Sequence, residues 1–300
     1  AVLYRAHYHS MEMQMEFVRR DIPFDMRSGI RFFEQAHIKD VTSYMRVLVN
    51  PRDELAWRRL LVMYPKVGKA TFNKIWQYLK KEDNPLHALL NDEFTRIMSK
   101  SARPGLEECR KTIRQLLDLP DNERIPEKII EVLLNRGGYR VYLQDNYSDA
   151  SSREEDLIQL GNFSGQFLQM EDFLNELALL TNMAKEENLG EEGDEDKVAL
   201  STIHQAKGLE WSYVFLIWCA DGMIPLQRAL KEEGGEEEER RLFYVAVTRA
   251  KDQLYLCYPA LDYTHSSGVL NLAPSRFIRE IAPLSEYDAD RPFEQWAVYD

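Results

Sequence analysis

Apolar side chains recur at intervals of three or four positions through much of the first two thirds of the chain. Between residues 53 and 180 nearly every apolar pattern has this period, which is that of helices packed on one face. A hydrophilic stretch from Lys185 to Asp196, with two glycines, then interrupts the pattern and predicts a linker. The expected helices in this part and before it cover residues 11–20, 37–49, 55–62, 71–79, 94–98, 107–117, 126–134 and 167–180.

Short apolar runs at the two ends of the chain predict strands instead. The run at 213–219 is apolar on consecutive positions, as in a parallel strand that is buried on both faces. A helix expected over 236–250 separates the last two runs, and this alternation of strands and helix predicts an α/β fold with a parallel sheet. The expected strands cover residues 1–4, 198–203, 213–219 and 253–258.

Because strands lie at both ends of the chain, both ends are expected to build one discontinuous α/β domain that carries an all-helical insertion. We place the first part of the sheet domain at residues 1–83 and the inserted helical subdomain at 84–190. The second part of the sheet domain, with a C-terminal tail, is placed at 191–300. The first strand begins abruptly at residue 1, as we expect of a segment cut from a longer protein.

Composition narrows the class of protein. With 44% apolar and 29% charged residues, the chain is expected to be soluble and globular, with a substantial core. The longest apolar stretch, Tyr213 to Ala220, is too short to span a bilayer, so no membrane partner is expected. The three cysteines are scattered without a CxxC pair, which argues against a zinc site or disulfides and favours the cytoplasm.

The net charge of −12 is unusual for a nucleic-acid binder, because DNA binding needs local positive charge. Much of the acid is concentrated in two runs, which we interpret as solvated loops, with an acidic regulatory patch as the alternative. The remainder of the chain is near neutral and is able to hold basic patches. The two runs consist of Glu186, Glu187, Glu191, Glu192, Asp194, Glu195 and Asp196, and of Glu232, Glu233, Glu236, Glu237, Glu238 and Glu239.

Two motifs in the last third carry candidate chemistry. The first, Thr202 to Trp211 (TIHQAKGLEW), follows an expected strand, where open α/β sheets bind their ligands. The second, Arg240 to Ala250 (RRLFYVAVTRA), is an expected helix that packs on the sheet. Arg249 lies near the end of this helix, and an arginine there suits a phosphate because it stays charged and offers a planar fork of donors.

In this order and at this spacing, the two motifs resemble motifs V and VI of the UvrD/Rep/PcrA family of superfamily 1 DNA helicases. The segment Leu3 to His7 (LYRAH) resembles their motif IV. The resemblance covers nearly the whole chain apart from about the last dozen residues, and implies a second RecA-like domain with its helical insertion. Further similar segments are Phe32-Phe33-Glu34, Ile38-Lys39-Asp40-Val41, Arg153-Glu154-Glu155-Asp156-Leu157, Asp172-Phe173-Leu174, Gly222-Met223-Ile224-Pro225 and Pro274-Ser275-Arg276-Phe277.

The resemblance implies roles for individual residues. Tyr4 is expected to stack on the adenine of ATP, although an aromatic residue of the core would look the same. Arg5 and Arg249 are expected to reach the γ-phosphate as catalytic arginine fingers. Glu210 is expected to bind the ribose hydroxyls, or else to cap a helix. The residues expected to hold single-stranded DNA are Thr202, His204 and Lys207.

The segment from Pro65 to Ile75 (PKVGKATFNKI) looks like the hairpin of a helix-hairpin-helix. Such a hairpin presents backbone N–H groups to a DNA phosphate at the start of a helix. We expect Lys66, Gly68, Lys69 and Thr71 to contact DNA here. The second glycine of the usual Gly-x-Gly is missing, so a plain helix–helix turn stays the alternative.

No G-x-x-x-x-G-K-[ST] phosphate loop occurs in the sequence. The resemblance implies an ATP-dependent 3′–5′ DNA helicase, acting on single-stranded and duplex DNA, whose first RecA-like domain supplies the missing loop and the Mg²⁺ ligands. We therefore expect ATP and Mg²⁺ as cofactors, no metal site in this chain, and no ATP hydrolysis by the chain alone. DNA-repair proteins are possible partners. The alternatives are a helicase-nuclease subunit and a non-enzymatic DNA-binding or partner-docking module.

Overall fold

The computed structural model describes residues 1–27, 32–186, 197–264 and 268–281. The chain divides into two compact units, one formed by residues 1–29 with 194–300 and the other by residues 30–193. The first unit contains a parallel sheet, and the second is built of helices in its described part. The two termini of the chain therefore belong to the same unit, as expected for a sheet domain interrupted by an insertion.

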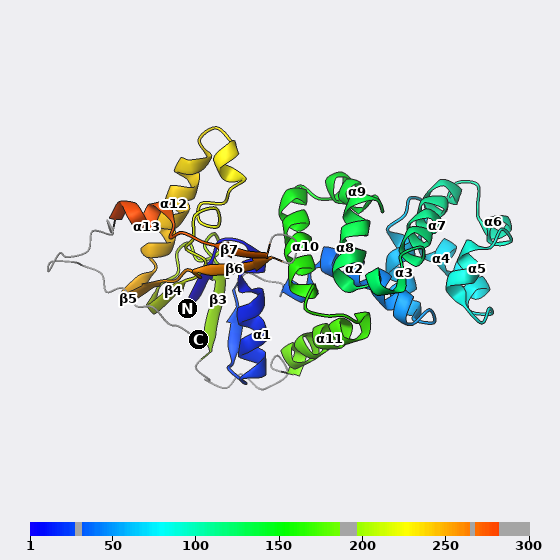
Figure 1. Ribbon diagram of the computed structural model, residues 1–300, viewed down its shortest axis with the longest axis horizontal. Coiled ribbons are helices and arrows are strands. Elements are labelled where there is room, and N and C mark those ends of the chain that lie inside the picture. Colours follow the sequence, from blue (N-terminus) through cyan, green and yellow to red (C-terminus); the bar gives the residue numbers. More distant parts are fainter. Residues whose placement is uncertain (28–31, 187–196, 265–267, 282–300) are drawn as a thin grey trace. The chain divides into compact units, whose positions relative to one another are not determined.

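The first unit is organised by a five-stranded parallel sheet in the order β2-β3-β1-β4-β5. Figure 1 labels the strands β3, β4 and β5 of this sheet. Strands from distant parts of the sequence pair directly: Tyr4 of β1 lies opposite Thr202 of β3, and Leu3 lies opposite Leu216 of β4. The sheet strands are β1 (Val2–Tyr4), β2 (Phe24–Met26), β3 (Val198–Thr202), β4 (Trp211–Leu216) and β5 (Ala250–Leu256). The other elements are η1 (His7–Ser10), α1 (Met11–Arg19), η4 (Ala229–Lys231), α12 (Gly235–Val247) and α13 (Arg276–Ile281).

Helix α12 packs on one face of this sheet. Its buried side chains Leu242, Phe243 and Ala246 meet Val214 and Leu216, which alternate along β4 toward the same side. The spacing of the three helical positions matches the period of a helix with one buried face. This cluster fixes the direction of α12 along the strands, and thereby places the two ends of the helix near different edges of the sheet.

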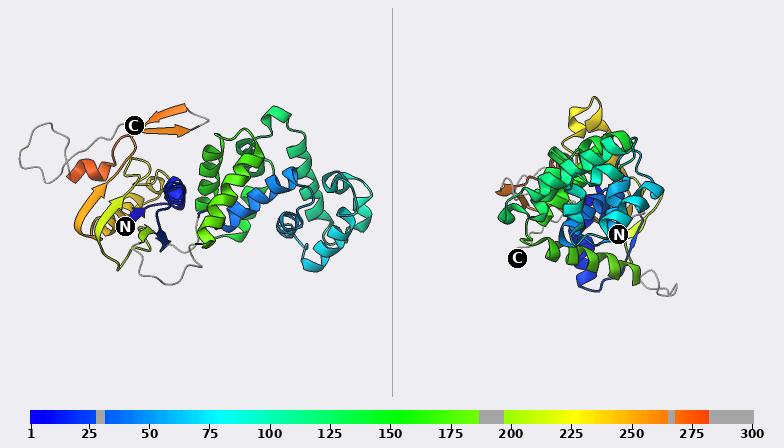
Figure 2. Two further views of the ribbon diagram at one scale, coloured as in Figure 1. Left: turned by 90° about the horizontal axis from the view of Figure 1, so that it is seen from below. Right: turned by 90° about the vertical axis from the view of Figure 1, so that its right-hand side faces the viewer.

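The opposite face of β4 is exposed, which corrects the prediction of a strand buried on both sides. The side chains of Tyr213 and Phe215 are 56% and 39% exposed, and the Phe215 ring stacks on Tyr255 of β5 at 4.3 Å between centroids. Consecutive apolar residues indicated two buried faces, but one face carries aromatic side chains that cover each other instead. A separate antiparallel hairpin, β6 (Leu261–Thr264) with β7 (Gly268–Asn271), lies outside the main sheet (Figure 2).

The second unit begins with η2 (Phe32–Glu34), and local signals account for the start of several of its helices. Asp53 caps α3 by accepting the backbone N–H of Ala56 at 3.0 Å, and Asn84 caps α5 in the same way from Leu86 at 3.0 Å. The helices are α2 (Ala36–Val49), α3 (Glu54–Val62), α4 (Lys69–Leu79), α5 (Pro85–Leu90), α6 (Phe94–Ile97), α7 (Arg103–Leu117), α8 (Pro126–Asn135), α9 (Tyr139–Asn146), α10 (Ala150–Ser164) and α11 (Met170–Glu186), with η3 (Asp121–Glu123).

A buried carboxylate joins three helices of this unit. Asp40 of α2, 4% exposed, accepts hydrogen bonds from Arg59 of α3 at 2.6 Å and from the hydroxyl of Tyr139 of α9 at 2.9 Å. A buried charge with these partners is satisfied, whereas an unpaired one would be costly. These hydrogen bonds connect α2 with α3 and with α9, and α2 is therefore part of the helical unit.

The expected domain boundary at residue 83 therefore differs from the division in the structure. Residues 30–83 belong to the compact helical unit rather than to the sheet unit, because α2 packs with α3, α8, α10 and α11. Sequence periodicity identified these helices but not their neighbours. The sequence patterns did not predict α5, α9, α10, α13 or the strands β2, β6 and β7, and most of the expected linker lies outside the described residues.

Candidate functional site

The carboxyl ends of β1 and β3 lie side by side and place Arg5 near His204. Arg5 follows directly on β1, whose last residue Tyr4 is level with Thr202, the last residue of β3. His204 comes two residues after that strand end. Polar residues from segments about 200 positions apart are thus brought to one edge of the sheet, which is where ligands bind in open parallel sheets.

Arg5 is held there by a buried carboxylate of α12. Its Nε donates to Glu239 Oε1 at 2.9 Å and its Nη2 donates to the same oxygen at 2.7 Å. The side chain of Glu239 is 2% exposed and that of Arg5 is 16% exposed. The second oxygen of Glu239 accepts the backbone N–H of Leu226 at 3.1 Å, so one carboxylate fixes both the arginine and the loop before α12.

Glu239 was not recognised from the sequence, because it stands in an acidic run that we interpreted as solvated. A signal for it was present: positions 239, 242, 243 and 246 have the spacing of one helix face, and the last three are apolar. The structure buries all four. An acidic residue on the apolar face of a helix predicts a buried partner of opposite charge.

The loop after β3 presents several exposed side chains, among them those of His204 and Lys207. Burial, and then the positive charge of Arg5, lower the pKa of His204 below its ordinary value, while Glu239 and Glu238 oppose this shift. The imidazole is therefore neutral at pH 7. Gly208 has a φ of +87°, a left-handed conformation that suits glycine and lets the loop turn back toward β4.

Thr202, by contrast, does not present its side chain to solvent. The residue is 6% exposed, and its hydroxyl accepts the backbone N–H of Gln205 at 3.4 Å. Its backbone carbonyl also accepts the N–H groups of Gln205 and Ala206 at 3.1 Å. Thr202 thus shapes the loop, and the structure supports His204 and Lys207, rather than this hydroxyl, as contacts for a ligand.

A second group of predicted residues lies at the amino ends of β4 and β5. Arg249 donates from Nη1 to the backbone oxygen of Leu209 at 2.9 Å and from Nε to that of Val245 at 2.9 Å. Glu210 follows Leu209, and its carboxylate is 3.7 Å from Lys251 Nζ, with both side chains 56% exposed. The structure therefore places Arg249 beside the segment of Glu210, with the guanidinium bound to one carbonyl in the last turn of α12 and to one in the loop before β4.

Arg5 and Arg249 do not converge in the structure. Arg249 accepts the backbone N–H of Trp211 at the start of β4, whereas Leu3 is level with Leu216 at the end of that strand. From Trp211 to Leu216 a strand extends about 17 Å, and Arg5 lies further along still. The expectation that both arginines reach one γ-phosphate is not supported, because they start from opposite edges of the sheet.

Tyr4 has no exposed surface, which contradicts an adenine-stacking role in this conformation. A stacking aromatic residue must offer a ring face to the base, whereas Tyr4 lies in the centre of the sheet between β3 and β4. The alternative of a core aromatic describes its position.

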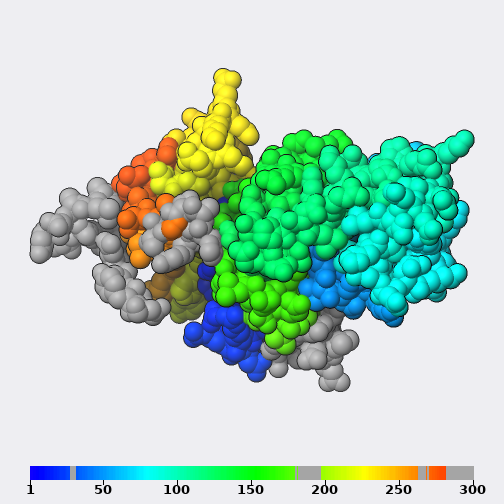
Figure 3. Space-filling view, turned by 45° about the vertical axis from the view of Figure 1, so that its right-hand side comes forward, coloured from blue at the N-terminus to red at the C-terminus, as the bar shows by residue number. Residues whose placement is uncertain are grey.

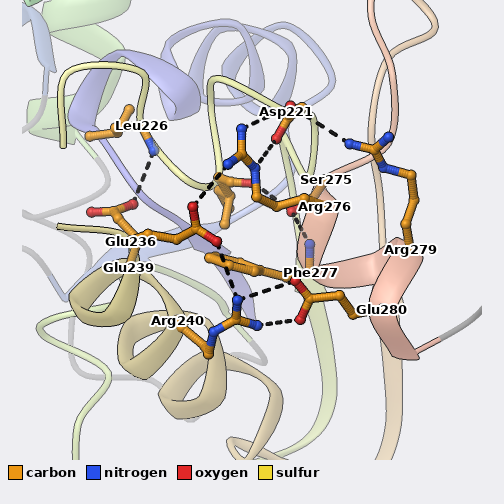
Figure 4. A network of polar contacts seen from close by, with 11 residues as sticks. Asp221, Leu226, Glu236, Glu239, Arg240, Ser275, Arg276, Phe277, Arg279 and Glu280 are labelled. Atoms are coloured by element: carbon orange, nitrogen blue, oxygen red, sulfur yellow. Dashed lines mark hydrogen bonds and ion pairs between the residues drawn. The ribbon is translucent and has the colours of Figure 1, made fainter. Parts of the chain in front are cut away.

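Below the loop at Leu226, a network of ion pairs ties α13 to α12 (Figure 4). Arg276 donates to Asp221 at 2.8 Å and to Glu236 at 2.9 Å. Arg240 of α12 pairs with Glu280 of α13. Hydrogen bonds from the side chain and the backbone N–H of Arg276, together with its positive charge, lower the pKa of Asp221 and favour the charged carboxylate. Figure 3 shows the segment before α12, in yellow, projecting from the surface.

In the second unit, the predicted hairpin precedes α4. Lys66 adopts a left-handed conformation with a φ of +62°, Val67 is buried, and Gly68 is the N-cap of α4. A Cβ at Gly68 would meet nothing within 4 Å, so the space over this glycine is open. Lys66 and Lys69 are exposed, and the first N–H groups of a helix have no partner within the helix.

Within the described residues, no helix is both long and apolar enough to cross a bilayer. Nor does the described part of the chain bring three or more histidine, cysteine or acidic side chains together as metal ligands. The three cysteines are free thiols.

Residues 1–260 match the model of the UvrD-like helicase C-terminal domain. The chain belongs to this family. It is 33% identical to the ATP-dependent DNA helicase PcrA of Bacillus subtilis over 293 residues, which cover 94% of this chain and 39% of that protein. It is 33% identical to a probable DNA helicase II homolog of Rickettsia conorii over 301 residues, 94% of this chain and 43% of that protein.

The ATP-dependent DNA helicase Rep of Buchnera aphidicola is 29% identical over 295 residues, 94% of this chain and 44% of that protein. The chain thus spans less than half the length of these relatives. The UvrD-like family accounts for the α/β fold with its parallel sheet. The predicted resemblance to UvrD, Rep and PcrA helicases is confirmed.

Proposed function

We propose that this chain is the second RecA-like part, with its helical insertion, of an ATP-dependent DNA helicase that moves 3′ to 5′ on single-stranded DNA. The proposal is supported by membership of the UvrD-like family and by the relatives, which are named as DNA helicases. ATP and Mg²⁺ are the cofactors proposed for the complete protein. Pathways of DNA repair or replication, and a cytoplasmic location, fit the same family.

The observation that carries the proposal is the placement of Arg249 beside the segment that contains Glu210. Both lie at the amino edge of β4 and β5, one exposed and acidic, the other with its guanidinium anchored on two carbonyls. A carboxylate suits the hydroxyls of a ribose, and an anchored guanidinium suits developing phosphate charge. We assign Arg249 as the arginine finger and Glu210 as the ribose contact, and no longer assign Tyr4 or Arg5 to the nucleotide.

Single-stranded DNA would follow the other edge, where His204 and Lys207 are exposed after β3. In the helical unit the hairpin residues Lys66, Gly68 and Lys69 would contact a phosphate of DNA, and Thr71 lies in the first turn of α4. This chain supplies neither a phosphate loop nor, in its described part, a cluster of acidic metal ligands. The first RecA-like domain would hold Mg²⁺, which neutralises phosphate charge, so the chain alone is expected not to hydrolyse ATP.

The test is ATP hydrolysis by the complete helicase with and without single-stranded DNA, for wild type and Arg249→Ala. Arg241→Ala is the matched control, because Arg241 lies on the same helix, is 72% exposed and pairs only with Glu238 among the described residues. We expect kcat of the Arg249 variant to fall by about 10³-fold or more, as for other arginine fingers, with little change in the control. An unchanged kcat in Arg249→Ala, or hydrolysis by this chain alone, would refute the assignment.

A further inference from the structure

Arg276 connects the loop after β4 with the start of α12, and the proposed function gives this contact no role. Its Nε donates to Asp221 Oδ1 at 2.8 Å, and its Nη1 donates to Glu236 Oε2 at 2.9 Å. Asp221 lies in the loop that follows β4, and Glu236 lies in the first turn of α12. Figure 4 shows the guanidinium of Arg276 between the two carboxylates, so a single side chain bridges these segments.

Two further contacts hold α13 along the first half of α12. Arg240 pairs with Glu280 of α13 and lies over the ring of Phe277, at 4.7 Å from its centroid. The Phe277 ring is 2% exposed and packs on Phe243 at 5.5 Å between centroids. Because Glu236, Arg240 and Phe243 are four and then three positions apart, one face of α12 makes all of these contacts. Movement of α12 along its own axis would therefore break the bridge and the neighbouring pair together.

The same helix leads to the proposed arginine finger at its other end. Arg249 comes two residues after the last residue of α12, Val247, and its guanidinium is bound to the backbone oxygens of Val245 and Leu209. From Glu236 to Val247 the helix rises about 17 Å, at 1.5 Å per residue. A displacement at the start of a rigid helix is carried to its end, and a misplacement of about 1 Å in a catalytic group lowers a rate by up to about 100-fold.

The bridge is too exposed to act mainly as a source of stability. The side chains of Arg276, Asp221 and Glu236 are 33%, 29% and 39% exposed, and exposed ion pairs contribute little to folding. The buried ring of Phe277 already attaches α13 to the unit. Apolar packing is not directional, whereas charged hydrogen bonds have defined lengths and angles. The ion pairs are therefore suited to select one position of α12 along β4.

We propose that Arg276 is a positioning residue for Arg249: by joining Asp221 to Glu236 it fixes α12 along β4 and thereby holds the finger at the phosphate. The inference rests on the proposed function, since it requires Arg249 to act as the finger. It gives the segment Pro274 to Phe277, which had no assigned role, a part in ATP hydrolysis. An Arg276 that only attached α13 to the surface would have no effect that depends on Arg249.

A double-mutant cycle of ATP hydrolysis by the complete helicase, with saturating single-stranded DNA, tests this dependence. Arg276→Gln should lower kcat about tenfold and leave KM for ATP unchanged, because a finger acts in the transition state. In an Arg249→Ala background the same substitution should have no further effect, since the misplaced group is already absent. Arg279→Gln is the matched control. Arg279 lies on the same helix and is 3.7 Å from Asp221, but among the described residues it makes no ion pair with α12.

A tenfold fall in both backgrounds would overturn the inference, because independent effects multiply. An unaltered kcat in Arg276→Gln, or an equal loss in Arg279→Gln, would overturn it as well. If Arg276→Gln does not fold, Glu236→Gln removes the partner on α12 at a site that is 39% exposed, and the same cycle with Arg249→Ala has the same expected result. An unchanged kcat in Arg249→Ala alone would refute the proposed function instead.

Discussion

Neutralising Glu239 should loosen the sheet unit far more than neutralising the residue beside it. The substitution Glu239→Gln leaves the guanidinium of Arg5 against an uncharged amide in a site where the acid is 2% exposed and the arginine 16% exposed. Breaking a fully buried ion pair by removing one partner costs about 3–5 kcal/mol. Because Arg5 is partly exposed and the amide still accepts the N–H of Leu226, we take the lower end, about 3 kcal/mol.

Hydrogen–deuterium exchange measures this effect within one unit, which a global unfolding curve of a two-unit chain does not. Since 1.4 kcal/mol corresponds to a tenfold change in an equilibrium constant, amides in β1 and α12 that exchange by opening of the unit should exchange about 100-fold faster in Glu239→Gln. Amides of α2 and α8, which belong to the helical unit, serve as an internal reference.

The matched control is Glu238→Gln on the same helix. Glu238 is 60% exposed and pairs with Arg241, which is 72% exposed, so its loss should cost about 0–1 kcal/mol. Equal exchange rates in the two variants would show that the pair between Arg5 and Glu239 contributes no more to the stability of the sheet unit than a surface ion pair. Glu239 would then have no role in holding Arg5 in position.

Three further predictions concern separate parts of the molecule. Gly68→Ala should change stability by no more than about 1 kcal/mol, because its Cβ meets nothing within 4 Å, yet weaken DNA binding measured by fluorescence anisotropy; unchanged affinity would favour a plain helix–helix turn. Arg5→Gln should raise the pKa of His204 in an NMR titration, although burial keeps it below the ordinary value, and no change would place Arg5 away from the imidazole. The pKa of Asp221 is lowered mainly by Arg276, so its stabilisation of α13 is present above the pKa of the unfolded chain and lost as pH falls through the folded value. Asp221→Asn should accelerate exchange in α13 at pH 7 and abolish this acid sensitivity, and an unaltered pH profile would contradict it.

The separation of Arg5 from Arg249 gives α12 a position between two sites. Glu239 near its start braces the edge proposed for DNA, and the helix leads to Arg249 at the edge proposed for ATP. The helix spans Gly235–Val247, so at 1.5 Å per residue it is about 20 Å long. A rigid helix of this length is a direct physical link between the two edges, and the Glu239 and Arg249 variants test its two ends independently.

The sequence by itself determined many of the segments that form helices and strands, and which family the chain resembles. Periodicity reports whether a position is buried, and it placed α2, α4, α8, α12, β1 and β3 within a few residues of their observed bounds. The motif containing Glu210 and the one containing Arg249 were recognisable because their residue types and order are local properties. Their proximity follows from the pairing of β4 with β5, which the structure shows.

Only the tertiary structure decided which partners the buried positions meet. Burial of Glu239 depends on Arg5, which lies 234 positions away, and the exclusion of Tyr4 from solvent depends on strands that flank it from the other end of the chain. The assignment of residues 30–83 to the helical unit likewise follows from contacts of α2 with later helices. Hydrophobic and electrostatic interactions act between neighbours in space, whereas periodicity records neighbours in sequence. For this reason the sequence suggested the same role for Arg5 and Arg249, although the two residues lie at opposite edges of the sheet.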